Sequence, residues 1–136
     1  MTKRLLLASF LILFAWILAD LLLHNLFLAP LYQQNPHLWR PLDQMNVALV
    51  FGVRLALLVT FVATYGWLVR PRTLVTGVAF GALTGLALGF AVGFGTYVHQ
   101  PIPLGMAWAW FFAAFAKSLA AGIIAGLLMQ ETPHNA

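Results

Sequence analysis

The chain has 136 residues, of which 62% are hydrophobic and only 7% are charged. Soluble globular domains carry about 25% charged residues, so this composition excludes a soluble protein and indicates a membrane protein. The formal net charge of +4 comes from seven scattered Lys and Arg residues, whereas a nucleic-acid-binding surface needs them clustered on one solvated face. The chain has no cysteine, which excludes disulfides, thiolate metal sites and cysteine catalysis. We therefore expect the lipid bilayer, and no nucleic acid, as its surroundings.

Four apolar stretches are each longer than the ~20 residues that a membrane-spanning helix needs. They predict helices over residues 5–29, 46–69, 74–98 and 104–129, with a loop at 30–45 and a polar tail at 130–136. We expect an all-α, polytopic membrane protein in which these four transmembrane helices form one antiparallel bundle and a single domain. The first stretch stays apolar beyond Asp20, so we expect a retained membrane helix there and no cleaved signal peptide.

The basic residues are unevenly distributed between the two sides of this bundle. Lys3 and Arg4 precede the first helix, and Arg70 and Arg72 lie in the link between the second and third helices. The opposite side carries only Arg40. Because cytoplasmic loops carry an excess of Lys and Arg, we expect both termini in the cytoplasm and the 30–45 loop outside.

Four ionisable side chains lie inside the apolar stretches. Asp20 and Arg54 are both expected about nine residues from the outer ends of their helices, and so at one depth. An unpaired charge there costs at least about 2.5–3.5 kcal/mol, so we predict an Asp20–Arg54 ion pair. Lys117 lies near the midplane of the fourth helix; it either joins a triad around Asp20, is neutral, or binds an anion. His24 follows Asp20 by one turn, so we expect the carboxylate to orient the imidazole, or both to face the bundle interior.

The third helix contains a comb of glycines at a spacing of four residues: Gly77, Gly81, Gly85, Gly89 and Gly93. The fourth helix has small residues at the same spacing: Ala114, Ser118, Gly122 and Gly126. Small residues let helix backbones approach closely in lipid, so we predict a tight contact that pairs these positions in antiparallel order, from Gly77 with Gly126 to Gly89 with Ala114. A four-residue step drifts by ~40° on a helix. The comb therefore either packs entirely inside the molecule or leaves part of its surface open for a second protomer, another subunit, or a flat cofactor such as a haem or quinone.

Three histidines, His24, His37 and His99, fall near the outer side and are weak candidates for a metal site. None has the helical spacing that would support one, so we predict no metal. The outer loop offers Tyr32, His37, Trp39 and Arg40 as candidate contacts with a partner, because exposed loop aromatics often anchor interfaces.

The segment ADLLLHNLFLAPLYQQNPHLWRPLDQMN resembles small four-helix proteins of the bacterial inner membrane whose function is unknown. The resemblance covers roughly residues 20–46. It implies a multi-pass protein of the bacterial inner membrane and brings no activity or catalytic residues with it.

Three functional interpretations follow from these features. The first is a structural or accessory membrane protein that self-associates or belongs to a larger complex. The second is a small homo-oligomeric transporter or channel that uses the buried charges as a proton or anion relay. The third is a redox subunit that binds quinone or haem. The sequence contains no Ser/His/Asp framework, phosphate loop or paired catalytic carboxylates, so we expect neither an enzyme nor a bound cofactor.

Overall fold

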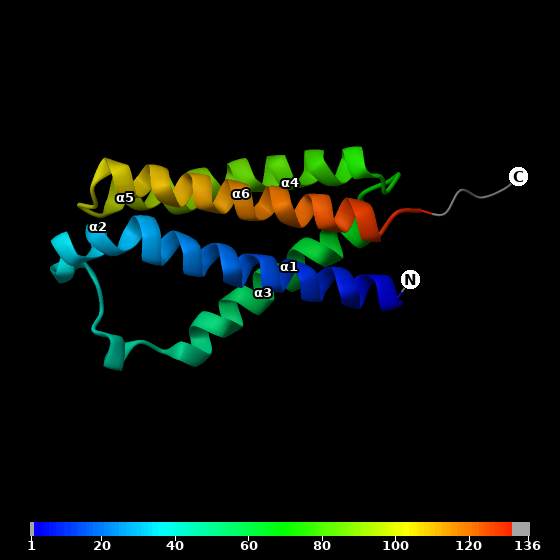
Figure 1. The fold of residues 1–136 in the computed structure, drawn as a ribbon. Helices are drawn as coiled ribbons and strands as arrows, with labels where there is room; N and C mark the ends of the chain where they lie inside the picture. The colour runs from blue at the N-terminus through cyan, green and yellow to red at the C-terminus, as the bar shows by residue number, and fades with distance from the viewer. Residues whose placement is uncertain (1, 132–136) are drawn as a thin grey trace, which may run out of the picture.

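The structure, a computed structural model, describes residues 2–131. Four helical spans are long and apolar enough to cross a membrane, and the described residues contain no strand. These findings confirm the predicted all-helical character, and the successive spans run in opposite directions (Figure 1). We call the end of the bundle with Lys3, Arg4, Arg70 and Arg72 the basic end, and the opposite end the loop end. Which end faces the cytoplasm stays a prediction.

The helical elements follow one another with short connections. In chain order they are α1 (Thr2–Leu23), the π-helical turn η1 (His24–Leu28), α2 (Ala29–Gln34), the 3₁₀ turns η2 (Pro36–Leu38) and η3 (Leu42–Gln44), α3 (Val47–Leu68), α4 (Leu74–Gly89), the π-helical turn η4 (Phe90–Phe94), α5 (Gly95–His99) and α6 (Leu104–Leu128). The last three spans begin and end within one residue of the predicted positions. The first span is longer than predicted and continues to Gln34.

The first span continues past Pro30 because a wider turn precedes it. Proline has no N–H to donate, and its ring clashes with the carbonyl four residues earlier in a regular helix. The helix opens into η1 just before this point, where the N–H of Ala29 donates to the carbonyl of His24, five residues back. The chain then resumes as α2. The predicted loop therefore shrinks to residues 35–46, which contain the two 3₁₀ turns.

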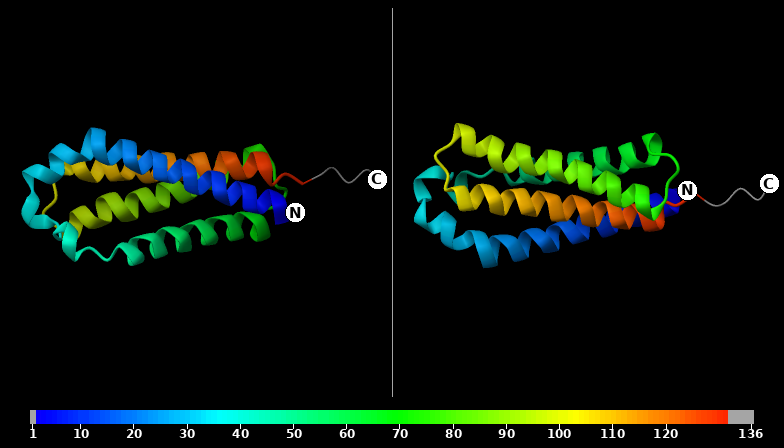
Figure 2. Two further views of the ribbon diagram at one scale, coloured as in Figure 1. Left: turned by 60° about the horizontal axis from the view of Figure 1, so that its bottom comes forward. Right: turned by 90° about the horizontal axis from the view of Figure 1, so that it is seen from above.

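The closest helix pair is α4 with α6, which lie side by side in Figures 1 and 2. All five glycines of the comb are buried. A Cβ atom on Gly81 would lie 2.6 Å from the carbonyl oxygen of Ser118 and 3.0 Å from the Cα of Gly122. These separations are too short for any side chain, so this approach of the two backbones requires glycine.

The register of the pair changes along its length. At the basic end Gly77 lies against Gly126, as expected from the sequence. Towards the loop end the nearest atoms belong to residues three positions earlier in α6 than expected, Phe115 for Gly85 and Phe111 for Gly89. The partly buried Ala114 is thus displaced from the predicted pairing. The reason is that a four-residue step overshoots one helical turn by about 40°, so the positions on α6 that face the comb combine steps of three and four.

The turn η4 keeps the last glycine of the comb in contact with α6. Its i→i+5 bonds widen the helix, which takes back part of the overshoot of a four-residue step. Gly93 is consequently buried against Ala107 and Phe111. Because α6 covers all five positions, the contacts support packing inside the molecule rather than an open glycine surface for a second protomer or a flat cofactor.

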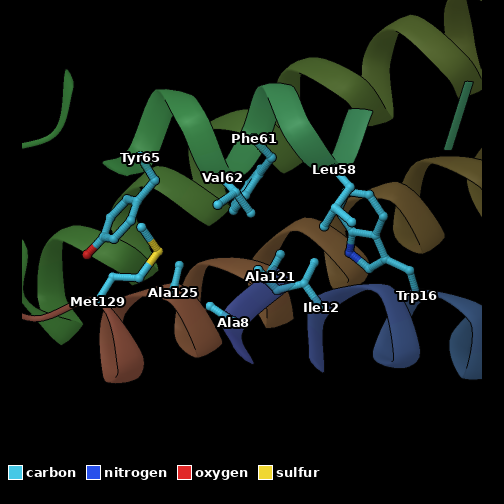
Figure 3. Close-up of a cluster of buried hydrophobic side chains, with 10 residues drawn as sticks. All are labelled: Ala8, Ile12, Trp16, Leu58, Phe61, Val62, Tyr65, Ala121, Ala125 and Met129. Carbon is cyan, nitrogen blue, oxygen red and sulfur yellow. The ribbon is translucent and has the colours of Figure 1, made fainter. Parts of the chain in front are cut away.

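The main hydrophobic core lies between α1, α3 and α6, towards the basic end (Figure 3). Its buried side chains are Ala8, Ile12, Trp16, Leu58, Phe61, Val62, Tyr65, Ala121, Ala125 and Met129. The Trp16 indole donates to the carbonyl of Lys117 at 2.9 Å, which ties α1 to α6. A second, smaller cluster at the loop end is built around Leu28, Ile102, Met106 and Ala107.

Helix α3 packs into the bundle only over its second half. Its buried residues are Leu58, Phe61, Val62, Tyr65 and Gly66. From Val47 to Leu57 no residue is buried, and the first half of the helix diverges from α1 in Figure 1. Both the face that points back towards the bundle and the opposite face of this half-helix are therefore exposed.

The close packing of α4 on α6 generates a prediction. Gly81→Ala should lower the free energy of unfolding in detergent by about 1–3 kcal/mol, because the added methyl group forces the two backbones apart. Gly105→Ala is the matched control: a Cβ there meets nothing within 4 Å, and alanine favours the helix. Thermal or denaturant unfolding of the two variants measures the difference. Equal destabilisation of both would contradict the packing argument.

Candidate functional site

The candidate site is a group of three charged side chains from three different helices. Asp20 comes from α1, Arg54 from α3 and Lys117 from α6. One carboxylate oxygen of Asp20 accepts from Arg54 Nη2 at 2.7 Å, and the other accepts from Lys117 Nζ at 2.6 Å. The side chains are 13%, 26% and 27% exposed, respectively. The predicted Asp20–Arg54 ion pair is confirmed, with Lys117 as its third member.

The pair forms although the two residues are not equally far from the ends of their helices. Asp20 lies fourteen residues before the end of α2 at Gln34, which corresponds to ~21 Å. Arg54 lies only seven residues after the start of α3 at Val47, or ~10 Å. The prediction assumed that the two residues lie equally far from the outer ends of their helices. That assumption is wrong, because the first span continues past Pro30. The pair still forms because α3 begins closer to the middle of the molecule.

The three side chains have complementary geometry, but two cations share one anion. Hydrogen bonds between ionised partners are roughly twice as strong as neutral ones, and each oxygen of Asp20 makes one. With both bases protonated, the formal charge of the group is +1. A site of this kind can hold three helices together, and it can also attract a small anion or pass a proton between neighbours.

His24 does not contact Asp20, so the predicted orientation of the imidazole by this carboxylate is wrong. Both oxygens of Asp20 are already used by cations. His24 Nδ1 instead shares a hydrogen bond of 3.2 Å with the hydroxyl of Tyr32, and the two rings stack at 5.6 Å. In a regular helix eight residues turn about 80° away from a common face; one residue absorbed by η1 reduces this to about 20°. The wide turn thus brings Tyr32 over His24.

Tyr32 is the centre of an aromatic cluster at the loop end. Its hydroxyl also accepts from the indole N–H of Trp110 at 3.2 Å, and its ring lies 4.9 Å from that of Trp39. Trp39 Nε1 is buried without a hydrogen-bond partner in the described part of the chain. The other two predicted loop contacts, His37 and Arg40, are exposed.

The remaining histidines do not come together. Within residues 2–131, no three His, Asp or Glu side chains lie where they could jointly hold a metal ion. His37 is in η2 and His99 ends α5, whereas His24 pairs with Tyr32.

Two features near the site were not predicted from the sequence. An apolar groove of about 320 Å³ runs between α1 and α6, and Lys117 is the one charged residue in its lining. Helix α3 also carries a second series of small residues at four-residue spacing, all exposed: Ala48, Gly52 and Ala56 in its first half, and Thr60 just beyond it. This spacing is readable in the sequence.

The charge imbalance of the triad generates a prediction. Asp20→Asn leaves two cations facing each other and should lower the free energy of unfolding by about 3 kcal/mol, the lower end for a broken buried pair. Lys117→Met leaves a balanced Asp20–Arg54 pair and should change stability by about 1 kcal/mol or less. Unfolding of both variants in the same detergent tests the order. If Lys117→Met is as destabilising as Asp20→Asn, the excess charge is not what limits stability.

Comparisons of the chain with protein-family models, with curated proteins and with solved structures give no match. The geometry of the described residues is therefore the basis for the function.

Proposed function

We propose that this chain is a structural or accessory protein of the bacterial inner membrane that works by association, and that the exposed first half of α3 is its contact surface. A second copy of the same chain is the partner we favour. Four apolar spans are consistent with a small membrane protein that has little mass outside the bilayer. The observation that carries the proposal is the exposed series of small residues on α3.

This series has the chemistry that drives helix association in lipid. Hydrophobic burial gives no driving force there, so helices associate through close backbone packing at small residues spaced by four. The comb of α4 follows this rule inside the molecule, where α6 covers it. On α3 the corresponding positions are exposed, and a Cβ added at Gly52 would meet nothing within 4 Å. The series can therefore pack against a helix from another chain.

The exposed half of α3 is held at two points. Asn46 precedes it, and its side chain accepts from the N–H of Leu49 at 3.0 Å, which caps the helix. Arg54, in the middle of the exposed half, is held by Asp20 at 2.7 Å. Arg54 and the small residues lie on different faces of α3. The ion pair can therefore hold α3 to α1 while the face with the small residues stays available.

Cysteine cross-linking tests this assignment, and the absence of native cysteines makes single introduced thiols unambiguous. Ala56→Cys should form a disulfide-linked dimer of twice the 14.9 kDa chain when native membranes are oxidised. Leu83→Cys on α4 is the control, because Leu83 is 68% exposed but lies on another helix. Cross-linking of Ala56→Cys to a heavier protein would assign the chain to a larger complex. No product, or equal dimer from Leu83→Cys, would overturn the proposal.

Bulk added to the small face of α3 should weaken association without unfolding the monomer. Gly52→Leu should reduce dimer affinity about tenfold, or ~1.4 kcal/mol, because the larger side chain keeps the two backbones apart. The monomer should keep its melting temperature because the site is open. Native mass spectrometry over a range of protein-to-detergent ratios measures the dimer fraction. An unchanged dimer fraction would place the interface elsewhere.

A proton or anion relay is the second candidate function, and the triad with its formal charge of +1 favours it. Intramembrane ionisable residues commonly mark such pathways, and Lys117 lies both at Asp20 and in the groove between α1 and α6. The protein in liposomes should then show a proton or chloride flux that Lys117→Met abolishes and that Lys3→Met, at the basic end, leaves intact. The absence of flux from the wild-type protein would exclude this function.

A further inference from the structure

A polar pocket of about 550 Å³ opens at the basic end. It lies where the start of α1, the end of α3, the link before α4 and the residues after α6 meet. The residues that matter for its chemistry are Arg4, Gly66, Trp67, Arg72 and Glu131. It is remote from the triad, and neither the structural role nor the relay uses it.

Arg72 is fixed rigidly at the wall of this pocket. Its side chain is only 11% exposed. Its Nε donates to the carbonyl of Met129 at 3.1 Å, and Nη1 donates to the carbonyl of Gly66 at 2.7 Å. These contacts join the ends of α6 and α3, so the guanidinium is already oriented before any ligand arrives. Nη2 points to Glu131 at 3.3 Å.

Glu131 occupies the position of a bound anion. One of its carboxylate oxygens lies 3.0 Å from Arg70 Nε and 3.3 Å from Arg72 Nη2. The whole chain has three acidic residues, and the other two are Asp20 in the triad and Asp43 in the loop-end segment. Among the described residues at this end, one carboxylate is accompanied by four bases, Lys3, Arg4, Arg70 and Arg72, which is a formal excess of three positive charges.

The pocket also has the surroundings of a lipid headgroup rather than of a solute in water. Trp67 is 72% exposed one residue before α3 ends, a position typical of the membrane interface. Leu5 lines the pocket, and the neighbouring Leu6 and Leu68 are 62% and 77% exposed on the apolar flank. Acyl chains attached to a phosphate in the pocket can continue along this flank.

We infer that this pocket binds the phosphate group of an anionic phospholipid, with Arg4 and Arg72 as its cationic contacts and Glu131 as an internal competitor for the same position. Basic pockets between transmembrane helices are suited to such headgroups, and guanidinium groups hold phosphate oxygens through paired hydrogen bonds. Glu131 weakens binding, because the phosphate must displace its carboxylate from the guanidinium groups.

Lipid retention by the full-length protein tests the inference. Native mass spectrometry from detergent would compare phosphatidylglycerol with phosphatidylcholine of the same acyl chains. We expect preferential retention of phosphatidylglycerol, about fivefold weaker in Arg4→Gln, since each basic residue near an anionic headgroup contributes about that factor. Glu131→Gln should shift binding in the opposite direction and strengthen it. Arg40→Gln, at the loop end, is the matched control and should leave retention unchanged.

Arg4→Gln should weaken lipid binding and Glu131→Gln should strengthen it. A general loss of folding cannot produce both results. Arg72→Gln removes contacts between helix ends and can unfold the protein, whereas Arg4 and Glu131 lie at the rim. Equal retention of the two lipids, or an effect of Arg40→Gln as large as that of Arg4→Gln, would overturn the inference. A second arm adds inorganic phosphate alone. Thermal stabilisation by phosphate together with equal retention of both lipids would assign the pocket to a soluble phosphate instead.

Discussion

Without side chains on its glycines, α4 lies directly against the backbone of α6, and the other helices are positioned relative to that pair. Lipid provides no hydrophobic force between helices, so the dispersion contacts of a close approach have to hold the bundle together. On its other side α6 presents Ala121 and Ala125, which admit the side chains of α1 and of the second half of α3. The indole of Trp16 then ties α1 to the backbone of α6.

The few charges of the chain follow one pattern at two places. Asp20 accepts from a lysine and an arginine in the middle of the bundle, and Glu131 forms ion pairs with two arginines at the basic end. Each group leaves positive charge in excess. The energetic consequences differ, because the surroundings of Asp20 are apolar and those of Glu131 adjoin the membrane surface. The central group therefore acts first as a clamp on three helices, while the terminal group is free to exchange its carboxylate for another anion.

The two series of small residues differ in their surroundings: one is buried in the bundle and the other is exposed. The glycines of the comb are buried inside the molecule, and the turn η4 keeps the last of them against α6. The small residues of α3 remain exposed: Ala48, Gly52 and Ala56 precede the point at which the helix joins the bundle, and Thr60 is exposed just beyond it. The same chemistry thus stabilises the monomer on one helix and, in the association we propose, forms the contact with a second chain on the other. Which role a small-residue series takes depends on whether a partner helix is within reach.

The sequence by itself determined the number of spans, both ends of three of the four spans, and the pairing of Asp20 with Arg54. Length and apolar composition decide the first two, and the cost of an unpaired charge in lipid decides the third. It also pointed to the contact of the two small-residue helices, although only the basic end kept the expected register, because helical drift accumulates along the pair.

Only the tertiary structure decided the features that depend on local departures from a regular helix or on several segments at once. The turn η1 lengthened the first span and brought Tyr32 over His24. A prediction from sequence periodicity assumes the same turn at every residue and therefore misses such a local widening. The divergence of α3 and the pocket around Arg72 each require the relative placement of three or more segments. Such placements arise from packing between elements distant in the chain, whereas a single sequence reports what each segment prefers alone.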